Sequence, residues 1–384
     1  MLKQALVVLS FAPLGALTAQ NPTITVRPND ALIDQPVAIV VSALPPRTQV
    51  VIRSYIRTDS ATYYAAEGTY LSDDRGEVRL DRDASRGGTY AGIDPMGLFW
   101  SGRRVTGVPD PGLSSLQAVQ PPQPYQVAFT VARSESVLAR ATVTRRFGAA
   151  DVREEEVRNG DVVGRLFLPP NARAAPVIIV LAGSEGGYES SSFKARMLAA
   201  HGFVALAQGY FRADGLRDEL ASVPVERVQR AIRWLQARRD INAARVGVLA
   251  HSRGTELALV SADRYEEIRA VVVSGTSVTT GSGLTRSGEP HAEAAWTFNN
   301  QPLPAMEHRP PPEALAQFSK PDPVRLRLLF EPGLRDADAV ERAAIPVGGI
   351  RADVMVISGI DDQMGPADIA GDMLIERLER AGHR

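Results

Sequence analysis

The sequence predicts two domains of different class, an all-β sandwich over residues 20–150 followed by an α/β domain with a parallel sheet over residues 151–384. Three observations lead to this prediction. The 384 residues exceed the roughly 100 to 200 that are typical of one domain. Short alternating apolar runs with intervening turn residues fill the first part, which is typical of a sandwich. From about Ala150 onward, apolar runs alternate with amphipathic stretches, the pattern of parallel strands joined by crossover helices.

The composition excludes several classes of protein. A formal net charge of -1 provides no basic surface for a nucleic-acid backbone, so no nucleic-acid partner is expected. With 44% hydrophobic and 23% charged residues, the chain lies in the globular range. The absence of cysteine excludes disulfides, thiolate nucleophiles and cysteine-bound metals. We also expect neither a metal nor an organic cofactor, because the reaction inferred from the motifs described next needs none.

Residues 1–19 are predicted to form a signal peptide. Lys3 precedes an apolar run over residues 5–16, and small residues lead to a cleavage site after Ala19. The run is too short to span a membrane, and Pro13 interrupts it. We expect a periplasmic or secreted bacterial protein without a stable membrane anchor; the alternative is an uncleaved anchor.

The elements of each domain follow from local patterns. In the first domain, residues 38–41, 49–55 and 125–131 are predicted strands, and no catalytic constellation appears among them. In the second domain, apolar runs suited to burial on both faces predict five strands, at residues 177–181, 204–207, 246–250, 270–274 and 354–358. Amphipathic stretches predict helices at residues 223–238, beginning near a proline, and 367–380. Residues 281–344 break this rhythm and form either a lid-like insertion or a long surface loop.

The sharpest chemical signal is a serine between a buried strand and a helix. Residues 246–262 read VGVLAHSRGTELALVSA, with Ser252 at the turn and the small residues Ala250 and Gly254 two positions to either side. Such spacing is typical of a nucleophile elbow, where small neighbours let the serine adopt a strained backbone that exposes its hydroxyl. This indicates an α/β-hydrolase domain with Ser252 as nucleophile. The alternative is a serine that merely caps the helix.

Backbone donors for an oxyanion hole are predicted on two loops. The strand at residues 177–181 runs into a glycine-rich loop, GSEGG, in which Ser184 is the candidate for the first N–H. The second N–H is expected from Arg253, the residue after the nucleophile. The spacing of a phosphate-binding loop is absent. An uninvolved glycine turn remains the alternative.

An acidic residue follows the strand at residues 354–358. Gly359 and Asp362 have the spacing expected for the acid of this fold, so Asp362 is the candidate and Asp361 its solvated or helix-capping neighbour. The order of nucleophile and then acid along the chain fits a serine triad. Alternatively, both aspartates cap the helix that begins near Pro366.

None of the five histidines is a good candidate for the general base. His383 follows Asp362 too closely, and His201, His291 and His308 precede the acid in the chain. His251 adjoins the nucleophile but is expected to turn away from it and to pack inside. The catalytic histidine is therefore expected beyond Arg384, which makes the domain incomplete at its C-terminus, the chain as given inactive and the strand at residues 354–358 an unpaired edge.

A family resemblance adds to these interpretations. The segment GGTYAGIDPMGLFW at Gly87–Trp100, together with HSRGTELAL and VISGIDDQ, resembles the family of acyl-CoA thioesterases and bile acid-CoA:amino acid N-acyltransferases. The likeness extends from about Thr23 onward. It implies a β-sandwich followed by an α/β-hydrolase domain, acyl-CoA esters as substrates, Ser252 as nucleophile, Asp362 as acid and a histidine beyond Arg384. Conjugating members carry cysteine at the nucleophile position and hydrolases carry serine, so Ser252 favours hydrolysis.

Three functions remain open at this point. The first is hydrolysis of acyl thioesters or carboxylic esters through an acyl-enzyme on Ser252. The second is acyl transfer to an amine or hydroxyl acceptor. The third is a non-catalytic, degenerate hydrolase that acts as a secreted binding protein.

Overall fold

A computed structural model describes residues 21–107, 110–307, 310–320 and 323–383. The predicted signal peptide, His308 and Arg384 lie outside these residues. The chain divides into two compact units between Arg146 and Phe147, close to the predicted boundary at residue 150. Among the residues that the structure describes, every helix is too short or too polar to span a bilayer.

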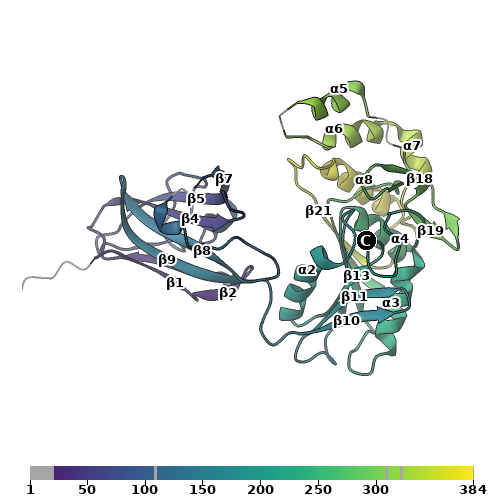
Figure 1. Ribbon diagram of the computed structural model, residues 1–384, viewed down its shortest axis with the longest axis horizontal. Coiled ribbons are helices and arrows are strands. Elements are labelled where there is room, and N and C mark those ends of the chain that lie inside the picture. Colours follow the sequence, from purple (N-terminus) through teal and green to yellow (C-terminus); the bar gives the residue numbers. More distant parts are fainter. Residues whose placement is uncertain (1–20, 108–109, 308–309, 321–322, 384) are drawn as a thin grey trace, which may run out of the picture. The chain divides into compact units, whose positions relative to one another are not determined.

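The first unit is a two-sheet β domain (Figure 1). One sheet has the order β1 (Thr23–Arg27), β3 (Ala38–Ser42) and β6 (Val78–Arg79). The other has the order β2 (Asp30–Leu32), β9 (Ser136–Arg146), β8 (Tyr125–Arg133), β4 (Gln49–Arg57), β5 (Thr62–Leu71) and β7 (Arg103–Thr106). The short helix α1 (Gly97–Trp100) and the 3₁₀ turn η1 (Pro111–Leu113) complete it. Ile39, Ile52 and Phe129 lie in one buried core, which confirms the predicted sandwich.

The second unit is built on a seven-stranded sheet, which confirms the α/β-hydrolase class. Its order is β10 (Arg153–Asn159), β11 (Val162–Leu168), β13 (Val204–Gly209), β12 (Val177–Leu181), β15 (Val246–His251), β16 (Ile268–Ser274) and β21 (Asp353–Ile357). Five strands are parallel and match the predicted ones to within two residues at each end. β10 and β11 were not predicted and pair antiparallel.

Helices cover both faces of this sheet (Figure 1). α2 (Glu189–Ala200) packs on one face, where Ala195 lies in a cluster with Val180 and Ala205. α3 (Glu226–Ala237) and α4 (Arg253–Arg264) belong to the larger core of the other face, and α8 (Ala367–Arg380) follows β21 as predicted. Strand side chains alternate between the two faces, so the parallel strands are apolar throughout.

The start of the predicted helix at residues 223–238 was wrong. Val223–Pro224 forms a short strand, β14, parallel to β19 (Trp296–Phe298), and the helix begins only at Glu226. The Val223 N–H donates to Ala295 O at 2.8 Å. The local pattern of these residues is typical of a helix start. Their pairing with a distant segment nevertheless holds them in an extended conformation.

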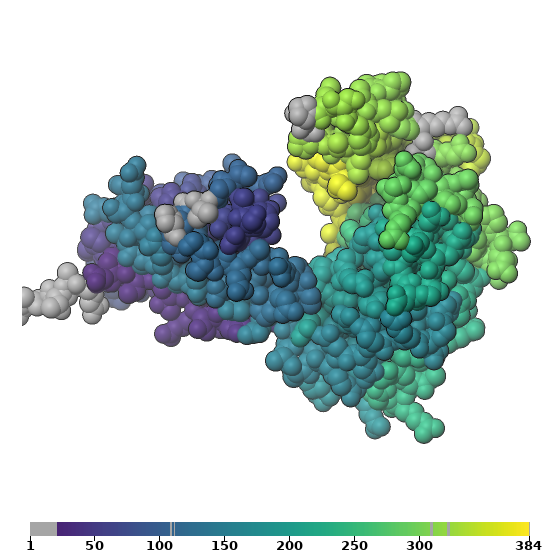
Figure 2. Space-filling model, in the orientation of Figure 1, coloured from purple at the N-terminus to yellow at the C-terminus, as the bar shows by residue number. Residues whose placement is uncertain are grey.

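The excursion over residues 281–344 consists of short elements, not a plain loop. It contains β17 (Ser282–Leu284), β18 (Pro290–Ala294), β19, β20 (Gln301–Pro302), α5 (Pro312–Leu315), η2 (Ala316–Ser319), α6 (Arg327–Phe330), η3 (Glu331–Arg335) and α7 (Ala337–Arg342). Its green surface adjoins the yellow C-terminal residues in Figure 2. Ion pairs fix it to α8, with Arg327 on Asp368 at 2.9 Å and Arg377 on Glu341 at 2.6 Å.

Candidate active site

Ser252 has the backbone of a nucleophile elbow. It lies between β15 and α4 with φ 52° and ψ -129°, a conformation that L residues rarely adopt. Its N–H donates to Ser274 O at 3.0 Å, and Thr255 Oγ1 donates to its carbonyl at 2.6 Å. A Cβ on Gly254 would lie 2.2 Å from Ala182 O, so only glycine lets α4 approach β12 this closely. The strained turn stands where the sequence predicted it, and the helix-capping alternative lacks a side-chain cap bond.

The loop after β12 lies against Ser252. A Cβ built on Gly183 would be 3.0 Å from Ser252 Cβ, which places the two backbones side by side. Gly186 and Gly187 turn the loop at φ 68° and 65°. Ser184 is exposed, and its N–H has no hydrogen-bond partner within the described ranges. Arg253 begins α4, and the first N–H groups of a helix have no intrahelical acceptor.

Asp362 leaves the same edge of the sheet. β15, β16 and β21 are parallel neighbours with His251, Ser274 and Ile357 in register, so the segments that follow them emerge together. Asp362 Oδ1 accepts the N–H groups of Met364 at 2.8 Å and Gly365 at 3.3 Å. Its carboxylate caps its own turn, and in the described chain no hydrogen bond or ion pair joins it to Ser252 or to a histidine.

Two further features lie at this part of the sheet, namely the turn residue Asp361 and the outer edge of β21. Asp361 Oδ1 accepts from Gln363 Nε2 at 2.7 Å, and Asp361 is exposed, as expected of a solvated neighbour of Asp362. β21 has no partner strand on its outer side among the described residues. Met355 is 58% exposed and Ile357 47% exposed, so this edge carries uncovered apolar side chains.

The expectation that His251 packs inside the domain was wrong. Its side chain is 43% exposed, and its Nε2 lies 4.0 Å from Glu185 Oε1. A Cβ built on Gly183 would be 3.0 Å from Ser252 Cβ and 3.3 Å from His251 Nε2, so the imidazole faces the loop beside Ser252. As the last residue of β15, His251 projects at the end of the sheet instead of packing within it.

The other described histidines lie elsewhere. His383 Nε2 is 2.8 Å from Ala352 O, just before β21 begins and thus at the opposite end of the strand from Asp362. His291, which belongs to the excursion, pairs with Glu219 at 3.5 Å. His201 caps the C-terminus of α2. Within the part of the chain that the structure describes, the Ser252 hydroxyl has no hydrogen bond to a histidine.

Two family models of one family match the chain. Residues 34–159 match the N-terminal region, and residues 223–384 the C-terminal region, of the acyl-CoA thioester hydrolase and bile acid-CoA:amino acid N-acyltransferase family. The chain belongs to this thioesterase and N-acyltransferase family. The family match includes the strained turn at Ser252 and the acid candidate Asp362.

Curated relatives agree with this membership. The chain is 32% identical to mouse acyl-coenzyme A thioesterase 3 over 276 residues, 69% of this chain and 62% of that protein. It is 27% identical to mouse bile acid-CoA:amino acid N-acyltransferase over 371 residues, 94% of this chain and 83% of that protein. A solved dienelactone hydrolase-like phosphotriesterase from metagenomic libraries is similar at 16% identity with a TM-score of 0.36, over 61% of this chain and 79% of that chain.

Glu185 and Lys194 place charges of opposite sign near His251. Glu185 accepts the Ser190 hydroxyl at 2.6 Å. Burial opposes its ionisation, but that hydrogen bond and nearby backbone N–H groups hold the pKa of Glu185 below its usual value. Burial likewise lowers the pKa of Lys194 on α2. Burial first and the Lys194 charge second lower the pKa of His251, whereas Glu185 opposes the shift. The net effect on His251 favours the neutral imidazole.

Removing the positive or the negative neighbour of His251 should shift the pKa of its imidazole in opposite directions. Lys194→Met removes a positive neighbour, so we expect the pKa of His251 to rise. Glu185→Gln removes the negative neighbour, so the pKa should fall further. The imidazole resonances of His251, followed by NMR against pH, measure both shifts. Shifts of the same sign in the two variants would contradict this placement of charges.

A buried network ties α4 to the excursion. Glu256 is 2% exposed and accepts from Arg253 Nη1 at 2.6 Å, Trp296 Nε1 at 2.8 Å and Gly281 N at 3.0 Å. Arg253 Nη2 also donates to Ser282 O at 2.7 Å. The side chains of Arg253 and Glu256 thus face the excursion and hold it against α4. The sequence analysis did not predict this role.

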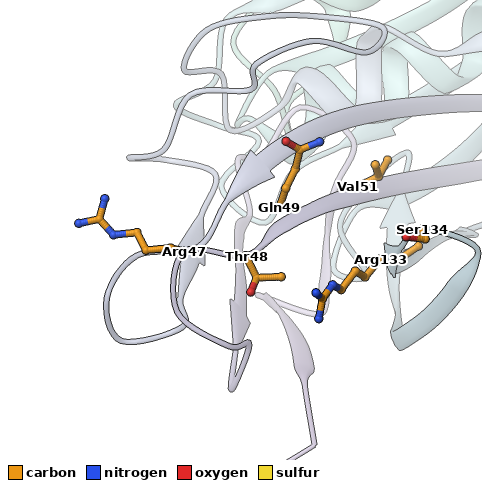
Figure 3. Close-up of a pocket in the computed structure, with 7 residues that line it drawn as sticks. Arg47, Thr48, Gln49, Val51, Arg133 and Ser134 are labelled. Atoms are coloured by element: carbon orange, nitrogen blue, oxygen red, sulfur yellow. The ribbon is translucent and has the colours of Figure 1, made fainter.

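Pockets are also present in the β domain. Two of them, of about 460 and 420 Å³, share Ala132 and Ser134 in their walls. Figure 3 shows the guanidinium of Arg47 pointing away from the other labelled side chains of the first pocket, and this group pairs with Asp74 at 2.6 Å. Across the described residues, no group of three or more histidine, aspartate or glutamate side chains is placed to hold a metal ion.

Proposed function

We propose that the protein hydrolyses acyl thioesters or carboxylic esters through an acyl-enzyme on Ser252. The observation that carries the proposal is the strained turn at Ser252, at φ 52°, beside a loop whose Ser184 N–H is unpartnered in the described chain. Strained serines at strand-to-helix turns expose their hydroxyls for attack. Relatives named as acyl-coenzyme A thioesterases support the thioester as substrate.

The reaction has two steps. Ser252 Oγ attacks the carbonyl carbon and gives up its proton to a base, while the carbonyl oxygen becomes an oxyanion. The N–H groups of Ser184 and Arg253 bind that oxyanion. The leaving thiolate or alkoxide departs with a proton, and water then releases the acid from Ser252 by the same path. We propose Asp362 as the carboxylate that orients the base, because it follows a parallel strand at the same edge of the sheet.

The proposal includes two kinds of leaving group, the thiol of coenzyme A and an alcohol. We propose export of the protein on the basis of residues 1–19, and an exported hydrolase would meet coenzyme A rarely. Carboxylic esters therefore stand beside acyl-CoA thioesters as candidate substrates. The serine at the nucleophile position supports hydrolysis over transfer to an amine.

Product analysis tests the function. The protein, in a form long enough to include the histidine expected beyond Arg384, is incubated with a short-chain acyl-CoA and, separately, with a nitrophenyl ester of the same acid, each with and without glycine as acceptor. We expect free acid as the product, in an amount that glycine does not change. An acyl-glycine product would show acyl transfer instead, and no turnover of either substrate would support the non-catalytic alternative.

A further inference from the structure

Tyr210 lies behind the loop that carries Ser184. It follows β13 directly and is 1% exposed. Its hydroxyl is 2.8 Å from Ala182 O and 2.9 Å from Gly183 O. A tyrosine hydroxyl has one proton to donate, so the two carbonyl oxygens share it. The hydroxyl thus draws two consecutive carbonyl groups of the loop to one point.

This contact fixes the direction of the next N–H. A trans peptide unit is planar, so its C=O and its N–H point in opposite directions. The carbonyl of Gly183 and the N–H of Ser184 belong to one such unit. With Gly183 O held by Tyr210, the Ser184 N–H must point away from Tyr210, and within the described residues it has no acceptor. An unpartnered N–H whose peptide cannot rotate is the kind of donor that an oxyanion hole requires.

The residues after Tyr210 hold the rest of the loop. Phe211 O accepts the Gly187 N–H at 3.0 Å, and Arg212 Nη1 donates to Glu185 O at 3.3 Å. A Cβ on Gly186 would lie 2.6 Å from Arg212 Cβ, so the two segments are in close contact. Residues 210–212 therefore fix the loop at three successive points.

Tyr210 is also connected to the helix that supplies the second donor. Its ring packs on Trp296 with centroids 5.6 Å apart, and Trp296 Nε1 donates to Glu256 of α4. Glu256 in turn binds the guanidinium of Arg253. The loop with Ser184 and the first turn of α4 thus rest on one buried group of side chains.

We propose that Tyr210 is a positioning residue that orients the Ser184 N–H toward the developing oxyanion. The inference rests on the proposed function and deepens it, since it names the group that aligns the oxyanion hole. Burial raises the pKa of Tyr210, so the phenol remains a donor throughout the working pH range.

Tyr210→Phe tests the inference because it removes the hydroxyl and keeps the ring. Loss of an oxyanion donor costs roughly 10²- to 10³-fold in kcat. Here the N–H remains, but Gly183 O keeps only the hydrogen bond from the Gly186 N–H at 3.4 Å, so the peptide is held less firmly. We therefore expect a smaller loss of about 10- to 100-fold in kcat with little change in KM. Tyr265→Phe is the matched control. Tyr265 is also buried, and its hydroxyl has no partner among the described residues, so kcat should stay unchanged.

A second measurement separates this inference from the proposed function. The amide exchange rate and nitrogen shift of Ser184, observed by NMR, should change in Tyr210→Phe and stay constant in Tyr265→Phe. An unchanged Ser184 amide would overturn the role of Tyr210, even in an active enzyme. A changed amide in a protein without hydrolase activity would support the orientation by Tyr210 and refute the proposed function. Equal loss of kcat in both variants would indicate general destabilisation and overturn the inference.

Discussion

Ser252→Ala abolishes hydrolysis if the strained serine at the elbow is the nucleophile. We expect turnover to fall by a factor on the order of 10⁶, because only binding and oxyanion stabilisation remain. Rates with the acyl-CoA and the nitrophenyl ester measure the loss. Covalent labelling by a fluorophosphonate probe should disappear in the same variant. Hydrolysis or labelling that survives the substitution would contradict the assignment.

Two variants of Ser184 separate the role of its backbone N–H from the role of its hydroxyl. Ser184→Ala keeps the backbone N–H, so activity should remain close to that of the parent protein. Ser184→Pro removes that N–H and should cost roughly 10²- to 10³-fold in kcat. If Ser184→Ala is as damaging as Ser184→Pro, the hydroxyl and not the N–H is the functional group.

Glu256→Ala should strongly destabilise the α/β domain. The substitution removes the acceptor of Arg253, Trp296 and Gly281 together. Loss of one partner of a buried ion pair costs about 3 to 5 kcal/mol, since the remaining charge stays buried without compensation. Urea denaturation followed by circular dichroism measures the change in the free energy of unfolding.

Two further substitutions make this result specific. Glu256→Gln keeps an oxygen for Trp296 and Gly281 but not the charge for Arg253, so its loss should be smaller than that of alanine. Glu266→Ala alters an exposed glutamate just beyond α4 and should stay within about 0.5 kcal/mol of the parent. Similar losses in Glu256→Ala and Glu266→Ala would show that the buried network contributes little.

Local patterns predicted the five parallel strands from their apolar runs, but they missed β11, in which Gly164 and Arg165 interrupt an apolar run. β12 and β15 are continuous apolar runs because both faces of a parallel strand are covered, and periodicity therefore found them. β10 was missed because it is an edge strand with the sequence REEEVRN, in which only Val157 is buried. Its charges protect an open edge, and they also hide the strand from a search for apolar residues.

Side-chain directions at the site could not be predicted in the same way. The motif around Ser252 predicted its turn, since small neighbours are a local requirement. The direction of His251 depends on how the loop at Gly183 approaches, and the role of Tyr210 depends on which carbonyl groups it meets. These contacts join segments far apart in the chain. No local pattern encodes them.

The pairing of β14 with β19 has a consequence for how the chain folds. Val223 and Trp296 are in register, and about 70 residues lie between them, including β15, Ser252 and α4. Bringing two such points together costs chain entropy before the contacts at the junction can form. The elbow is therefore assembled inside a closed loop, and the Trp296 partner of Glu256 arrives only with the far end of that loop. A nascent chain that has passed Ser252 but not Trp296 still lacks the hydrogen bond from Trp296 to Glu256 of α4.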